Sequence, residues 1–141
     1  MKFIFIIVFV YTSFFMKSRT LYGNPNDSIQ VDSLLSFTKT LLGTNYKYAS
    51  CSPKAGFDCS GFVNYVFSHF GVKVPRSSSD FNKFGVTIHP DSFKIGDVIV
   101  FTGTSSKNRA PGHVGIVMSN YGSDLQFIHS SSNKKHSGVK I

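Results

Sequence analysis

The 141-residue chain contains no glutamate and only two cysteines. Its acidic residues are seven aspartates, against fifteen lysines and arginines, which gives a formal net charge of +8. Two cysteines exclude a scaffold held by several disulfides, but a single Cys51–Cys59 disulfide stays open as an alternative to free thiols. The paired short spacings of structural zinc sites are also missing. A zinc site built from Cys51, Cys59, His113 and His129 therefore stands only as an alternative.

The basic residues are not arranged for nucleic-acid binding. Lys134-Lys135 and Lys107-Asn108-Arg109 are short clusters without interleaved aromatic residues, so we expect no nucleic-acid partner. The positive balance suits attraction to an anionic wall or envelope, and it is equally typical of solubility charge scattered over loops. The chain has no internal repeats, and its length allows one domain.

Long apolar runs are missing except at residues 3–15, which follow Lys2. This run is shorter than the ~20 apolar residues of a membrane-spanning helix, and a basic start before such a run is typical of a secretory signal. No cysteine lies near the end of this run, which argues against a lipid anchor. The flank at 19–23 has no small-x-small cleavage site, so an uncleaved membrane anchor is the alternative. The expected organisation is an export signal at 1–22, a linker at 23–33 and one domain at 34–141, with the protein periplasmic, in the cell envelope or extracellular.

A cysteine is present at the expected first turn of a helix. Asp58 is the expected N-cap and Gly71 the stop signal. The apolar residues between them fall on one face at a period near 3.6: Phe62, Val63, Val66, Phe67 and Phe70. Cys59 would then lie where free backbone N–H groups and the positive end of the helix dipole favour the thiolate. The sequence therefore predicts a nucleophile at Cys59.

Two histidines downstream can supply the base that such a nucleophile needs. His113 opens one expected strand and His129 ends the next, with a turn signal at 121–124 between them. In an antiparallel hairpin the two histidines would be cross-strand neighbours, so that one imidazole holds the other. His136, in the polar loop that follows, is the alternative third residue.

The remaining pattern places helices first and strands afterwards. A helix capped by Asp27 or Ser28 is expected to end at Gly43, and residues 98–101 are the strongest strand candidate. This order indicates an α+β fold in which the nucleophile helix packs on an antiparallel sheet.

These residues resemble the NlpC/P60 family of papain-like cysteine peptidases, which hydrolyse cell walls. The likeness runs from about Leu34 to Ile141. It rests on ordered motifs: Tyr46, Gly56-Phe57-Asp58-Cys59-Ser60-Gly61-Phe62, Val74-Pro75-Arg76, Ile95-Gly96-Asp97-Val98, His113-Val114-Gly115-Ile116 and Phe127-Ile128-His129-Ser130. The resemblance implies a papain-like fold with Cys59 as nucleophile, His113 as general base and His129 as the residue that orients His113. It also implies that Tyr46 lies near the oxyanion site and that Asp58, Ser60 and Arg76 shape substrate binding.

The same resemblance implies hydrolysis of peptidoglycan stem peptides between D-glutamate and a diamino acid, without a cofactor or metal. We expect the protein to be a monomer. The alternatives are a CHAP-like amidase, an acyltransferase with the same Cys/His arrangement, or an inactive wall-binding module. The sequence departs from the family at Ala49-Ser50, which replace a Gly-Gly pair, and at Phe81, where the family often has glutamine. It stops at Ile141, where the family continues, so the domain is expected to lack its last strand.

Overall fold

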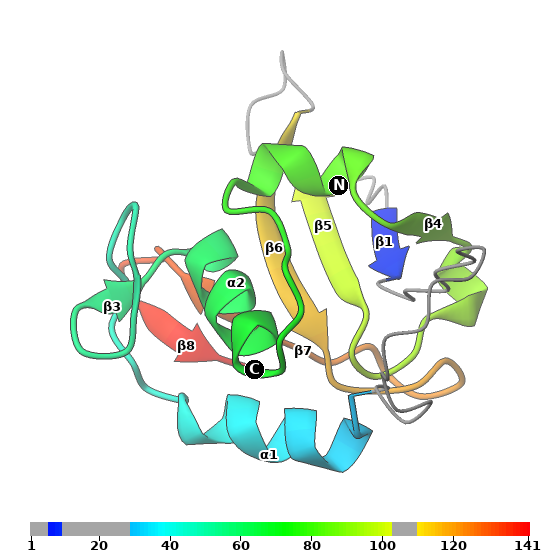
Figure 1. Cartoon of the computed structure of the whole chain (residues 1–141), viewed down its shortest axis with the longest axis horizontal. Coiled ribbons are helices and arrows are strands. Elements are labelled where there is room, and N and C mark those ends of the chain that lie inside the picture. The colour runs from blue at the N-terminus through cyan, green and yellow to red at the C-terminus, as the bar shows by residue number, and fades with distance from the viewer. Residues whose placement is uncertain (1–5, 10–28, 103–109) are drawn as a thin grey trace, which may run out of the picture.

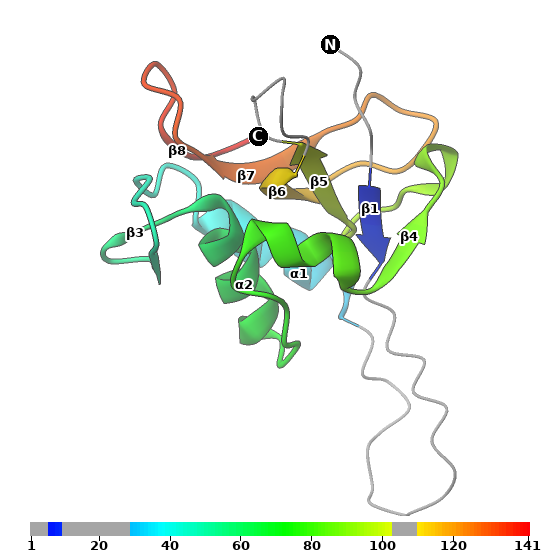
Figure 2. The same cartoon turned by 90° about the horizontal axis from the view of Figure 1, so that it is seen from above.

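Helices cover one face of an antiparallel sheet in the computed structural model, which describes residues 6–9, 29–102 and 110–141. Figures 1 and 2 show the two α-helices on the same side of the strands. The helical elements are α1 (Val31–Thr40), α2 (Cys59–His69) and the 3-10 turns η1 (Ser78–Lys83) and η2 (Pro90–Ser92). Within these described ranges, no helix is long and apolar enough to cross a membrane.

The main sheet has six strands in the order β4-β1-β5-β6-β7-β8, and each neighbouring pair is antiparallel. Their bounds are β1 (Ile6–Phe9), β4 (Val86–Ile88), β5 (Val98–Thr102), β6 (Pro111–Val117), β7 (Phe127–Ser131) and β8 (Gly138–Lys140). The α+β prediction is confirmed. Strand β1 lies within the segment expected as an export signal, and it pairs with β4 and β5.

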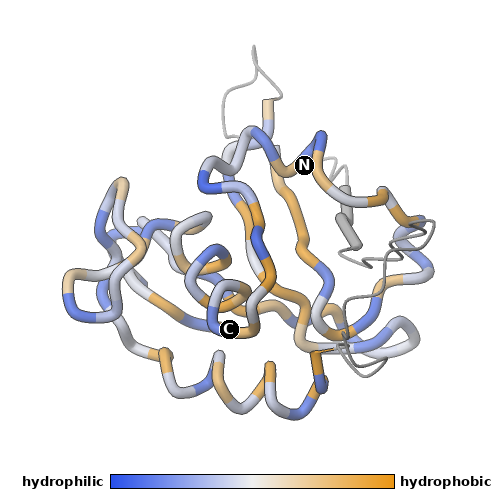
Figure 3. Tube along the Cα trace, in the orientation of Figure 1, coloured by the Kyte–Doolittle hydropathy of each residue, from blue (hydrophilic) through white to orange (hydrophobic). Residues whose placement is uncertain are grey.

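The core lies between α2 and the sheet because both present apolar side chains there. Strand β5 is apolar along most of its length, as Figure 3 shows. The fully buried residues that meet across this layer are Phe62, Val63 and Val66 of α2 with Val98, Val114, Ile116 and Ile128 of the sheet. Each such side chain contributes about 1.5–3 kcal/mol by leaving water. A smaller cluster on the opposite face of the sheet contains Phe93, Ile99 and Val117.

The ends of the helices follow from local chemistry where the structure describes them. Helix α2 ends before Gly71, whose φ of +74° suits glycine. Helix α1 begins after Gln30, which makes no side-chain capping bond. The expected caps Asp27 and Ser28 lie outside the described residues.

Several boundaries differ from the sequence-based expectation: α1 ends at Thr40, before Gly43, and β7 continues past His129 to Ser131. The segment 44–57, expected as a loop, contains a short hairpin of β2 (Cys51–Ser52) and β3 (Gly56–Phe57). Gly56 carries a φ of +111°, and a Cβ there would lie 2.7 Å from the Asn45 carbonyl oxygen. Strand β6 begins at Pro111, two residues before His113.

Candidate active site

Cys59 is the first residue of α2, and its position depends on how the chain enters that helix. The carboxylate of Asp58 accepts a hydrogen bond from the backbone N–H of Gly61 at 2.6 Å, which confirms the predicted N-cap. The carbonyl of Ser50 accepts from the N–H of Asp58 at 2.9 Å and passes directly over Gly61. A Cβ at Gly61 would collide with that carbonyl. The missing side chain therefore lets the β2–β3 segment close against the start of α2.

The thiol of Cys59 is half-buried beside the beginning of β6. Burial raises the pKa of Cys59, and hydrogen bonds from the amides of Val114 and Ser60 lower it by a smaller amount. The carboxylate of Asp58 raises it further. The amides at the start of the helix favour the thiolate as expected, but desolvation disfavours the charged form more, so the net direction of the pKa is upward. Burial thus favours the neutral thiol over the thiolate.

The two predicted histidines are hydrogen-bonded to each other. Nε2 of His113 lies 2.6 Å from Nδ1 of His129, and the rings meet edge to face with centroids 4.8 Å apart. The pairing of Ile116 with Ile128, extended along the strands, sets His129 opposite Gly115 rather than His113. The histidines are thus diagonal neighbours on one face of the β6–β7 hairpin. This bond uses Nε2 of His113, so Nδ1 is the His113 ring nitrogen that takes no part in it.

Both imidazoles are uncharged near neutral pH. Burial lowers the pKa of His113. Burial also lowers the pKa of His129 to about 4, with further contributions from the positive charges of protonated His113 and of Lys140. Desolvation therefore opposes a positive charge on either ring. The pair is uncharged at rest and accepts a proton only during the reaction.

The carbonyl of Phe57 connects the nucleophile helix to the histidine strands. It accepts from the backbone N–H of Lys47 at 3.0 Å and from Oγ of Ser130 at 2.7 Å. Ser130 is fully buried and follows His129 directly. The peptide before Asp58 is therefore fixed to β7 at the level of the histidine pair.

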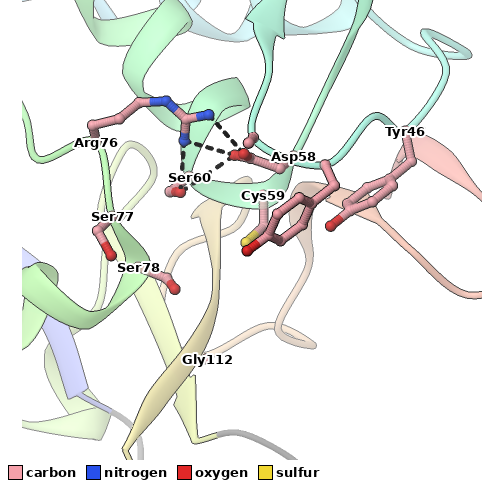
Figure 4. A pocket seen from close by; sticks show the side chains of 10 residues that line it. Tyr46, Asp58, Cys59, Ser60, Arg76, Ser77, Ser78 and Gly112 are labelled. Carbon is pink, nitrogen blue, oxygen red and sulfur yellow. Dashed lines mark hydrogen bonds and ion pairs between the residues drawn. The ribbon is translucent and has the colours of Figure 1, made fainter.

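A pocket of about 440 Å³ opens beside Cys59. Figure 4 shows Cys59 and Tyr46 on one side of it and Ser77 and Ser78 on the other. Its lining residues are Tyr46, Tyr48, Ala49, Asp58, Cys59, Ser60, Arg76, Ser77, Ser78 and Gly112. The lining contains every predicted site residue except the two histidines.

Arg76 is fixed by the cap of α2. Its guanidinium donates to both carboxylate oxygens of Asp58, at 2.9 and 2.6 Å, and to Oγ of Ser60 at 3.2 Å (Figure 4). Ser60 in turn donates to Asp58 at 3.3 Å. Asp58 thus caps the helix and holds Arg76 at the pocket wall, with 43% of the arginine side chain still exposed to solvent.

Two tyrosines stand at the mouth of the pocket. Tyr46 forms an isolated parallel bridge with Phe57. Burial raises its pKa, and the nearby charges of Cys59 and Asp58 add to the effect. Tyr48 is 83% exposed. Ala49 follows it with a φ of +55°, where the family pattern has glycine.

Sequence reasoning missed several of these residues. Tyr48, Ser77, Ser78 and Gly112 line the pocket without having been predicted, although Tyr48 lies two residues from Tyr46. Ser130 belongs to a motif quoted for the resemblance, but its bond to Phe57 was not predicted, because it joins segments 73 residues apart in the sequence.

The sequence left three alternatives open: a Cys51–Cys59 disulfide, His136 as the third residue, and a zinc site. Cys51 and Cys59 are both free thiols, Cys51 being exposed. His113 bonds to His129, while His136 is exposed on the β7–β8 loop. In the part of the chain that the structure describes, no group of three or more histidine, cysteine or acidic residues is placed to hold a metal ion, so the zinc alternative has no ligand set there.

Comparisons with known proteins agree with this geometry. Residues 43–140 match the model of the NlpC/P60 family. The chain is 34% identical over 130 residues to a gamma-DL-glutamyl hydrolase of Bacillus subtilis, covering 92% of this chain and 30% of that protein. It is 33% identical over 113 residues to a gamma-D-glutamyl-L-lysine dipeptidyl-peptidase of Bacillus cereus, covering 79% of this chain and 32% of the relative.

A solved structure supports the same assignment. The crystal structure of an NlpC/P60 family protein from Bacillus cereus superposes with a TM-score of 0.66 at 30% identity, covering 79% of this chain and 34% of that one. The chain thus spans about a third of the length of these relatives. It belongs to the NlpC/P60 family.

Proposed function

We propose that this domain is a cysteine endopeptidase that hydrolyses peptidoglycan stem peptides by attack of the Cys59 thiol. The observation that carries the proposal is the meeting of α2 and the β6–β7 hairpin. The backbone amide of Val114, the residue after His113, lies close enough to Cys59 to lower the pKa of its thiol, while the His113 ring is bonded to His129. A thiol, a neutral imidazole and a second imidazole that orients it are the parts that acyl transfer requires.

The reaction begins from neutral groups. As the Cys59 sulfur attacks an amide carbonyl, its proton passes to Nδ1 of His113. The bond from Nε2 of His113 to Nδ1 of His129 stabilises the imidazolium that forms. His113 then gives the proton to the leaving amine as the C–N bond breaks, and a thioester remains on Cys59. Water attacks the thioester with His113 again as the base, which releases the acid and restores the thiol.

The developing oxyanion needs donors near the sulfur. Backbone N–H groups at the start of α2 and the hydroxyl of Tyr46, which lines the same pocket, are the candidates. One such donor contributes roughly 3–4 kcal/mol in the transition state. Asp58, Ser60 and Arg76 shape the adjoining wall, where charged groups of the peptide bind.

We propose that the enzyme cleaves the bond between D-glutamate and the following diamino acid of the stem peptide. Two relatives carry names for cleavage at glutamyl bonds, and the exposed Arg76 guanidinium offers a partner for a substrate carboxylate. We also propose that the protein acts outside the cytoplasm as a monomer, exported by residues 1–22, with residues 23–33 as linker and the catalytic domain after them.

Digestion of purified peptidoglycan tests the proposal. Wild type should release new amino termini, and Cys59→Ala should release none while still binding the wall, since the substitution removes only the sulfur. Cys51→Ser is the matched control and should digest normally. Release by Cys59→Ala equal to that of wild type would exclude Cys59 as nucleophile.

Mass analysis of the fragments separates the endopeptidase from the alternatives. An endopeptidase leaves the L-alanyl-D-glutamyl stump on the sugar, whereas a CHAP-like amidase leaves the sugar free of peptide. Wall binding without any release by wild type would indicate an inactive binding module. Wild-type fragments that lack a free D-glutamyl carboxyl end would contradict the proposed bond.

A further inference from the structure

Lys140 of β8 lies directly across from His129. The β7–β8 pairing makes His129 and Lys140 partners, with Ser130 opposite Val139. Residues opposite each other on antiparallel strands project from the same face with their Cβ atoms about 4.5–5.5 Å apart. His129 is thus flanked on that face by His113 from β6 and by Lys140 from β8.

The charge of Lys140 is not neutralised within the described residues. The ion pairs there join Arg76 with Asp58 and His89 with Asp91, and the Lys140 side chain is only half-buried. The charges that bear on His129 are the ring of His113 and the ammonium group of Lys140, and no described carboxylate is among them. Helix α2 brings its neutral thiol to β6, so Lys140 is a cation facing the histidine pair without a counter-ion.

We propose that Lys140 is a positioning residue for catalysis: its ammonium group adds to the burial that keeps His129 uncharged, so that the proton taken from Cys59 stays on His113. The inference rests on the proposed function. A bond of 2.6 Å between the two rings offers the proton an easy transfer to His129. Such a transfer would move the positive charge away from the sulfur and take the acid away from the leaving amine. A cation at Lys140 makes the imidazolium form of His129 less favourable than that of His113.

The test replaces Lys140 and follows the titration of His129 by NMR. Lys140→Met keeps the aliphatic stem and removes the charge, so the pKa of His129 should rise by about half a unit, as expected for one partly screened charge at this range. Lys140→Glu should raise it further, and Lys140→Arg should restore the wild-type value. Lys135→Met, the matched control on the exposed β7–β8 loop, should leave it unchanged.

Kinetics link the titration to catalysis. In Lys140→Met, kcat for stem-peptide hydrolysis should fall with KM unchanged, and the acid limb of the kcat profile should move; Lys140→Arg should rescue both. An unchanged His129 titration in Lys140→Met and Lys140→Glu would overturn the inference, and so would a shifted titration with wild-type kcat at every pH. If wild type itself hydrolyses no stem peptide, the proposed function fails, and a shift in His129 would still show the charge coupling alone.

Discussion

Oγ of Ser130 donates a 2.7 Å hydrogen bond to the carbonyl of Phe57. Phe57 stands two residues before Cys59 and Ser130 one residue after His129, so this bond links the entry to the nucleophile helix with the histidine strands. The bond is buried, where its geometry is least disturbed by water. The relative position of sulfur and imidazole depends on it.

Ser130→Ala should therefore weaken activity beyond its effect on stability. Loss of one buried hydrogen bond costs about 1 kcal/mol, since the Phe57 carbonyl keeps its bond from Lys47. Denaturant unfolding measures that loss, and kcat should fall with KM little changed. Ser123→Ala, which removes an exposed turn hydroxyl bonded to Asn120, is the control. A stable Ser130→Ala variant with normal kcat would contradict the role given to this bond.

Gly115 should not tolerate a side chain. A Cβ at this position would lie 2.9 Å from the Phe127 ring, 3.0 Å from the Ile128 carbonyl oxygen and 3.2 Å from Cβ of His129. Because the obstacles include backbone, Gly115→Ala should displace β7 and lengthen the bond between His113 and His129. We expect a large loss of kcat and altered chemical shifts of both imidazoles.

Gly122→Ala serves as the comparison for Gly115→Ala. Gly122 has a φ of +97° and open space around it, so this variant should lose roughly 1 kcal/mol of stability through backbone strain and keep its activity. Equal kcat in the two glycine variants would show that the space at Gly115 has no bearing on the site.

Cys59 should react as a neutral thiol. In a Cys51→Ser background, where Cys59 is the remaining cysteine, the rate of alkylation by iodoacetamide should rise with pH to beyond the ordinary thiol range, because burial raises the pKa of Cys59. A rate that is already at its plateau near neutral pH would instead indicate a preformed thiolate–imidazolium pair. His113→Ala in the same background separates these cases further, since only a preformed pair would lose its plateau.

Asp97 should make stability fall as the pH rises. Burial raises the pKa of this carboxyl from 3.8 to about 6, and only 3% of the residue is exposed. Between about pH 4 and pH 6 the folded protein holds a proton that the unfolded chain has released, so the contribution of Asp97 to the unfolding free energy decreases by about 3 kcal/mol across that window. The lowered pKa values of His113 and His129 have the opposite effect, since they make the unfolding free energy increase as the pH rises.

Asp97→Asn isolates the effect of this carboxyl. The amide keeps an acceptor for the N–H of Lys94, which bonds the carboxylate at 2.7 Å. Measured by urea unfolding, the stability of the variant relative to wild type should increase from pH 4 to pH 7. A difference that stays constant over this range would show that Asp97 is already ionised in the folded protein at low pH.

The local parts of the site could be predicted from the sequence. An aspartate before an apolar stripe indicated the N-cap of α2, and two strands around a Tyr-Gly-Ser-Asp turn indicated the hairpin that brings His113 to His129. These predictions succeeded because each depends on residues close together in the chain. The diagonal placement of the two histidines did not follow, because the register was not evident from the turn.

The long-range features could not be predicted. The direction of the Cys59 pKa depends on how deeply the folded chain buries the thiol, which no local pattern contains. The β2–β3 hairpin was taken for a loop because its strands are two residues each and its geometry depends on contacts of Gly56 with Asn45. The pairing of Lys140 with His129 required the position of β8.

The left-handed backbone of Ala49 sets how firmly the rim of the pocket is held. An alanine in this conformation costs about 1–2 kcal/mol relative to its preferred region, and glycine would adopt it freely while also loosening the unfolded chain. A modest gain in heat resistance is therefore accessible by one substitution at this position. Its cost would be greater freedom for Tyr48, so selection for thermal tolerance and selection for a well-placed aromatic ring would favour different residues here.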